Sequence, residues 1–97
     1  MSVSLSTHVL DTGSGRPAQG VEVEVRRGDD QVAHGETDAD GRIAELAQGL
    51  EAGTYTLVFA PPSPFFRRVE LDVALEDGHY HVPLLVAPYA CASYRGS

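Results

Sequence analysis

The chain of 97 residues has little of what exported or nucleic-acid-binding proteins require. Cys91 is its only cysteine, so no disulfide can form within the chain and the cysteine framework of small secreted domains is missing. Arginine and lysine together number 7 against 14 acidic residues, for a formal net charge of −7. Because phosphate backbones are bound mainly by clustered basic side chains, we expect no nucleic-acid partner.

Long apolar runs are also missing. No stretch approaches the ~20 apolar residues of a membrane-spanning helix, and residues 1–7 lack both the basic and the apolar region of a secretory signal. We therefore expect a soluble, cytoplasmic protein with no membrane partner. The content of 42% hydrophobic and 22% charged residues is typical of a folded chain, and the length predicts a single domain over residues 1–97. Such a small domain buries a modest share of its surface, which favours oligomers.

Alternating patterns typical of β-strands dominate the sequence. Val21, Val23 and Val25 alternate with charged residues, and residues 55–59 and 69–75 repeat the alternation. Glycine and aspartate turns separate these runs, which is typical of a β-sandwich. A helical turn within residues 44–52 is an alternative for that segment, and the prolines of 61–64 predict a stiff connector. The spacing predicts an all-β sandwich of eight strands, near residues 3–10, 20–27, 31–36, 42–46, 54–60, 67–75, 79–86 and 88–95.

Strand parity places two histidines on outward faces. His8 lies opposite the face of Leu5 and Val9, and His81 lies opposite the face of Tyr80 and Val82. Outward groups on two strands can meet only if the strands are neighbours or if a second subunit covers the sheet. The sequence leaves both possibilities open.

Two motifs resemble metal sites, and for both we favour another interpretation. His79 and His81 share a strand face and could hold zinc with His8 as a third ligand, but solvated histidines are the more common outcome of this weak pattern. Asp38–Gly41 resembles part of a calcium loop, yet the glutamate that closes such a loop is missing, so we predict a hairpin turn. On spacing alone, Arg42, just after this turn, is a solvated charge. We expect no metal and no cofactor.

Motifs spread over essentially the whole chain are more specific in combination. They lie in the segments Leu5–Thr12, Gly15–Ala18, Thr37–Arg42, Gly53–Tyr55, Pro64–Phe66, His79–Leu85, Pro88–Tyr89 and Tyr94–Ser97. The run His-Tyr-His-Val-Pro-Leu-Leu followed by the closing Tyr-Arg-Gly-Ser is the most specific combination among them. Together these motifs resemble the 5-hydroxyisourate hydrolases, the transthyretin-related enzyme family of purine catabolism.

The resemblance implies a transthyretin-like (prealbumin-like) eight-stranded sandwich that assembles as a homotetramer, with active sites at the dimer–dimer interface. It implies hydrolysis of 5-hydroxyisourate to 2-oxo-4-hydroxy-4-carboxy-5-ureidoimidazoline in urate catabolism, by histidine-assisted attack of water on the ring lactam and without a cofactor. The residues that it assigns to the site are His8, Arg42 and His81 for catalysis, and Tyr94, Arg95, Gly96 and Ser97 for substrate binding.

Within this resemblance, one imidazole would deprotonate the water, His81 in preference to His8, and the other would orient it or protonate the leaving nitrogen. Arg42 and Arg95 would hold the oxygen-rich ring and stabilise charge on the attacked carbonyl. Family members usually carry a short helix where this chain has only residues 60–63, so we expect that helix to be missing. The alternatives are a non-catalytic transthyretin-like module that binds a small ligand and a β-sandwich interaction module.

Overall fold

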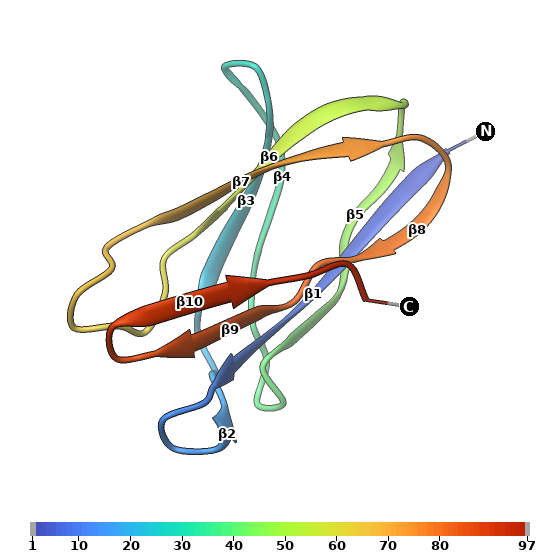
Figure 1. The fold of residues 1–97 in the computed structure, drawn as a ribbon. Helices are drawn as coiled ribbons and strands as arrows, with labels where there is room; N and C mark the ends of the chain where they lie inside the picture. Colours follow the sequence, from blue (N-terminus) through green and yellow to red (C-terminus); the bar gives the residue numbers. More distant parts are fainter. Residues whose placement is uncertain (1, 97) are drawn as a thin grey trace.

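The computed structural model describes residues 2–96, which form two β-sheets packed face to face (Figure 1). Between residues 2 and 96 there are strands and turns but no helix, and hence no helix long and apolar enough to cross a membrane. The six-stranded sheet contains β1 (Val3–Asp11), β2 (Arg16–Pro17), β5 (Arg42–Leu50), β8 (Gly78–His81), β9 (Leu84–Ala87) and β10 (Ala90–Ser93). The four-stranded sheet has the order β4 (Asp30–Glu36), β3 (Glu22–Arg27), β6 (Gly53–Phe59) and β7 (Val69–Leu75).

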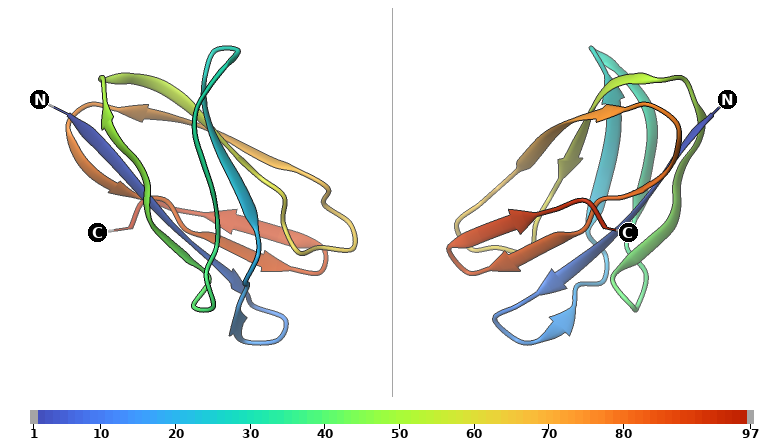
Figure 2. Two further views of the ribbon diagram at one scale, coloured as in Figure 1. Left: turned by 180° about the vertical axis from the view of Figure 1, so that it is seen from behind. Right: turned by 45° about the vertical axis from the view of Figure 1, so that its right-hand side comes forward.

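Strand β1 is the centre of the six-stranded sheet. Along one edge it pairs in parallel with β8 and then with β9, and along the other edge it pairs antiparallel with β5 and then with β2. Figure 2 shows β1 in blue between β5 in green and β8 in orange. Segments more than seventy residues apart in the sequence therefore lie side by side.

The all-β sandwich is confirmed, but the described residues form ten strands and not eight. The strand predicted over residues 79–86 is divided into β8 and β9, because Pro83 has no N–H for the sheet ladder. At this break the Thr7 hydroxyl donates a hydrogen bond of 2.6 Å to the Val82 carbonyl, which keeps both halves against β1. The tenth strand is the short β2, which was not predicted.

The segment that could have formed a helical turn, residues 44–52, instead belongs mostly to β5, which runs to Leu50. The register of its pairing with β1 shifts on both sides of Leu5, as it does at β-bulges. The connector after β6 contains no helix. There the Ser63 hydroxyl oxygen accepts hydrogen bonds from the backbone N–H groups of Phe65 and Phe66, at 3.1 and 2.9 Å.

The core lies between the sheets and follows the predicted parity. Leu5 and Val9 of β1 and Leu57 and Phe59 of β6 are completely buried. Burial of this apolar surface, roughly 25 cal/mol for each Å², is the main force that holds the sheets together. It leaves the other face of β1 free for polar side chains. The remaining core members are Val3, Ala18, Val21, Val23, Val25, Leu46, Ala47, Tyr55, Leu75, Val82, Leu84 and Val86.

Candidate active site

The outer face of β1 carries a row of polar side chains that meets both neighbouring strands. Ser6 lies opposite His81 of β8, and His8 lies opposite Arg42 of β5. Side chains at paired positions lie on the same face of a sheet, ~5 Å apart at their Cβ atoms. The structure therefore brings His8, Arg42 and His81 together on three adjacent strands, without help from a second subunit. Strand parity had left open whether the strands of the two histidines are neighbours, and the structure shows that they are.

A tight turn sets Arg42 at the start of β5. The Asp38 carboxylate accepts hydrogen bonds from the backbone N–H groups of Asp40 and Arg42, at 2.9 and 3.0 Å, as predicted for a turn capped by aspartate. The prediction of a hairpin was wrong, because this turn connects β4 of one sheet to β5 of the other and these two strands do not pair. Gly41 has a φ of 74°, and a Cβ there would lie 2.5 Å from the Val9 carbonyl oxygen. The turn therefore requires glycine. Within residues 2–96 the exposed guanidinium of Arg42 makes no ion pair.

The same turn determines the tautomer of His8. Its Nε2 lies 3.0 Å from the Asp40 carbonyl oxygen, which can only accept a hydrogen bond. Nε2 must therefore carry a proton, and in the neutral ring Nδ1 is the acceptor. This half-buried imidazole can accept a hydrogen bond at Nδ1 when neutral and donate one there when protonated.

His81 is held from two sides. The Ser6 hydroxyl lies 2.7 Å from its Nδ1, and on the other side the Gly96 N–H donates a hydrogen bond of 2.7 Å to its carbonyl oxygen. A Cβ on Gly96 would lie 2.6 Å from Cδ2 of the imidazole, so only glycine lets the tail come so close. With one edge of the ring on Ser6 and the other against Gly96, Nε2 is the nitrogen left for a substrate.

The pKa of His81 lies below its usual value of 6.5. Burial is the largest cause, because it disfavours the charged ring, followed by the positive charges of His8, Arg42 and His79. At neutral pH the imidazole is therefore neutral and able to accept a proton.

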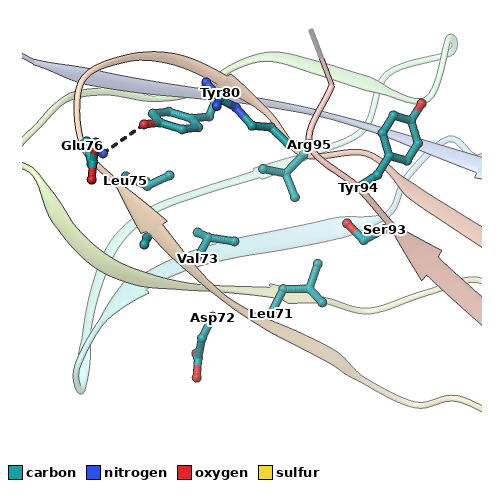
Figure 3. Close-up of a pocket in the computed structure, with 11 residues that line it drawn as sticks. Leu71, Asp72, Val73, Leu75, Glu76, Tyr80, Ser93, Tyr94 and Arg95 are labelled. Carbon is teal, nitrogen blue, oxygen red and sulfur yellow. Dashed lines mark hydrogen bonds between the residues drawn. The ribbon is translucent and has the colours of Figure 1, made fainter.

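The other tail residues are placed differently. The Arg95 guanidinium lies 4.3 Å from the centre of the Tyr80 ring in a cation–π contact (Figure 3). Because Tyr80 and His81 are successive residues of β8, this contact is on the face of the strand opposite His81. There Arg95 lines a cavity of about 470 Å³ between β7 and β10, whose walls carry apolar side chains such as Leu71 and Val73 and also polar ones such as Asp72 and Ser93. The Tyr94 side chain is 56% exposed, and Ser97 is outside the described residues. The structure thus brings Gly96, but not the side chain of Arg95, to His81.

Two hydroxyl groups in the site were not singled out from the sequence. Ser4 and Ser6 share the parity of His8, but their importance depends on which strand lies beside β1, and no local pattern reveals that. Ser6 is buried and bonds to His81, and both serines also bond to His79. Within residues 2–96 no three His, Cys, Asp or Glu side chains are grouped so that they could hold a metal ion.

Comparison with known proteins identifies the family of the chain. The model of the HIUase/Transthyretin family matches residues 5–96. A 5-hydroxyisourate hydrolase from Caulobacter vibrioides is 45% identical over an alignment of 112 positions that covers 96% of this chain and 97% of the relative. Since this chain has 97 residues, the relative carries residues that are missing here.

Solved structures are similar over the whole fold. The 5-hydroxyisourate hydrolase of Klebsiella pneumoniae superposes with a TM-score of 0.89 at 37% identity, covering 98% of this chain and 99% of that one. Transthyretin from Sparus aurata superposes with a TM-score of 0.84 at 28% identity, covering 96% of each chain. By sequence, by fold and by the match over nearly its entire length, the chain belongs to the HIUase/Transthyretin family.

Proposed function

We propose that the protein hydrolyses 5-hydroxyisourate, opening the six-membered ring at its lactam carbonyl to give 2-oxo-4-hydroxy-4-carboxy-5-ureidoimidazoline in urate catabolism. The relatives from Caulobacter and Klebsiella that carry this activity in their names support the proposal. The observation that carries it is the register of β1, which sets His8 opposite Arg42 and places His81 one strand away on the same face. Lactam hydrolysis needs a base for water and a cation for the developing oxyanion, and this face offers both.

His81 is the general base in this proposal. Its Nδ1 is occupied by Ser6, so Nε2 takes the proton from the attacking water. The lowered pKa supports this role because the ring remains unprotonated at neutral pH. The reaction uses water alone and requires no cofactor.

Arg42 stabilises the negative charge that develops on the carbonyl oxygen. Its guanidinium is exposed and makes no ion pair within the described range, so its donors are free for a substrate oxygen. A cation that is placed before the reaction costs no reorganisation when charge appears in the transition state.

His8 either orients the attacking water or protonates the leaving nitrogen. In its neutral form Nδ1 accepts a hydrogen bond and orients the water, and in its protonated form Nδ1 donates to the leaving nitrogen. The Asp40 carbonyl supports both forms, since Nε2 is protonated in each.

The tail residues Tyr94, Arg95, Gly96 and Ser97 bind the substrate. Gly96 already lies against His81, whereas Arg95 reaches the ring of the substrate only after it leaves Tyr80. The site lies on an open sheet face where Arg42 is exposed, so enclosure of a purine-sized molecule needs a second subunit. We therefore include in the proposal a homotetramer with active sites at the dimer–dimer interface. We also include a cytoplasmic location, with which a chain lacking an internal disulfide is compatible.

The test is the decay of freshly prepared 5-hydroxyisourate, followed by its ultraviolet absorbance with and without the purified protein. We expect strong acceleration, and we expect His81→Asn to lower kcat by roughly 10² to 10⁴. His34→Asn is the matched control, because His34 is exposed on β4 of the other sheet and should leave the rate unchanged.

Three outcomes would contradict parts of the proposal. Binding of the substrate without acceleration would indicate a carrier. A rate abolished by EDTA would restore the zinc interpretation of the histidines. Full activity in a species that elutes as a monomer would exclude a site shared between subunits.

A further inference from the structure

A continuous hydrogen-bonded chain leads from His81 to the edge of the site. Its Nδ1 lies 2.7 Å from the Ser6 hydroxyl oxygen, which lies 2.8 Å from Nε2 of His79. The other nitrogen of His79, Nδ1, lies 2.7 Å from the hydroxyl of Ser4. The four groups alternate between β1 and β8, in the order His81, Ser6, His79 and Ser4.

The single proton of Ser6 makes the chain directional. A hydroxyl has one proton to donate, so Ser6 can donate to one imidazole only and must accept from the other. If both imidazoles donated, the buried hydroxyl would keep a proton with no partner within residues 2–96, which is costly. Two fully satisfied arrangements remain, and they run in opposite directions.

The two directions give His81 opposite chemistry. When His81 donates from Nδ1 to Ser6, Ser6 donates to His79 and His79 donates to Ser4, and the neutral His81 ring has a lone pair on Nε2. When the chain starts from Ser4 instead, Ser6 donates to Nδ1 of His81 and the proton of the neutral ring is on Nε2. Only the first arrangement produces a base at the nitrogen that faces the open site.

We propose that Ser6 and His79 are positioning residues for the reaction, and that the chain His81–Ser6–His79–Ser4 holds the neutral His81 ring in the tautomer protonated on Nδ1. The direction of the chain rests on the proposed function, because hydrolysis requires the lone pair on Nε2. The existence of the chain rests on geometry alone. Neither Ser6 nor His79 needs to touch the substrate.

The hydrogen-bonded chain also gives a role to the second histidine of β8. Spacing by two residues puts both rings on one face of the strand, and the parallel register sets Ser4 opposite His79 and Ser6 opposite His81. Ser6 therefore reaches His81 directly and His79 diagonally. His79 is exposed and its partner Ser4 is half-buried, so the far end of the chain is open to water.

The decisive experiment is ¹⁵N NMR of the full-length protein with labelled histidine imidazoles, at a pH where His81 is neutral. We expect the His81 proton on Nδ1 in the wild type. In Ser6→Ala we expect the proton to redistribute toward Nε2, the nitrogen that an unconstrained imidazole prefers to protonate. A wild-type ring protonated on Nε2, or a tautomer that ignores Ser6→Ala, would overturn the proposal.

Kinetics provide the second readout. Ser6→Ala and His79→Leu should lower kcat by roughly 10- to 100-fold, as is typical when the partner that orients a functional histidine is lost, and should change KM by no more than about threefold. His79→Gln should recover most of the rate, because its side-chain oxygen can accept the Ser6 proton. His34→Leu on the other sheet is the matched control. A normal kcat in His79→Leu would remove His79 from the mechanism.

These readouts separate the two proposals. If the wild-type protein does not accelerate the decay of 5-hydroxyisourate, the proposed function fails, while the NMR result still decides whether the chain sets the tautomer. If the wild type is active and His81 is protonated on Nε2, the proposed function is supported and the proposal that the chain sets the tautomer of His81 is wrong.

Discussion

Replacement of Gly96 by alanine tests the contact between the tail and His81. The backbone of Gly96 is already paired with His81 through the hydrogen bond of 2.7 Å. An added Cβ would lie 2.6 Å from Cδ2 and 3.2 Å from both Cβ and Cγ of the imidazole side chain. Carbon atoms pack best at roughly 3.5 to 4 Å, so Gly96→Ala forces a separation of about 1 Å.

The imidazole or the tail must move by that amount. If the tail moves, it loses a backbone hydrogen bond worth about 1 kcal/mol and carries the substrate-binding residues away. If the ring moves, the base leaves its position, and a misplacement of ~1 Å costs roughly 100-fold in rate. We therefore expect kcat/KM to fall about 100-fold. A raised KM would show that the tail moved, and a lowered kcat would show that the ring moved.

The assay is the ultraviolet decay of 5-hydroxyisourate, alongside thermal unfolding of both proteins. Gly28→Ala is the control, since a Cβ there meets nothing within 4 Å, while its φ of 62° imposes backbone strain of about 1 to 2 kcal/mol. It should lower stability without lowering kcat. Wild-type kcat and KM in Gly96→Ala would refute the reasoning, because the imidazole would then tolerate a carbon atom where the structure leaves no space.

Two further predictions concern charge and buried polar groups. Because the pKa of His81 is lowered, the acid limb of the kcat/KM profile should lie below pH 6.5. Arg42→Gln removes a positive charge that lowers this pKa, so the acid limb of the residual activity should shift to higher pH. An unchanged limb would show that the charge of Arg42 does not lower the pKa of His81. Thr37 is buried, accepts a hydrogen bond of 2.8 Å from the Val21 N–H and donates one of 2.7 Å to the Ala18 carbonyl. Thr37→Val should therefore cost about 2 to 4 kcal/mol in denaturant unfolding at fixed protein concentration. Thr12→Val, which loses a single, longer hydrogen bond that is only partly buried, should cost about 1 kcal/mol or less.

Much of the fold follows from local patterns in the sequence. The valines at 21, 23 and 25 are buried as their alternation predicts, and residues 38–41 form a turn with the predicted aspartate cap and positive φ at Gly41, although the turn connects the two sheets and is not a hairpin. These features depend on the period of a strand and on the φ of one glycine, which are local properties. The division of the strand at Pro83 was open to the same reasoning, since a proline without an N–H interrupts a central ladder.

The site itself depends on contacts that no local pattern specifies. The motifs singled out His8, Arg42 and His81. They did not reveal that β1, which carries His8, lies between β5 with Arg42 and β8 with His81. They also did not reveal that Ser6 joins His81 to His79, or that Arg95 faces Tyr80 and not the histidines. Parallel pairing of strands more than seventy residues apart is decided by which apolar faces pack best in the whole core. The sequence alone therefore determined which segments form strands and which side chains share a face of each strand. Which strands pair with β1, and with that the geometry of the site, was decided only by the tertiary structure.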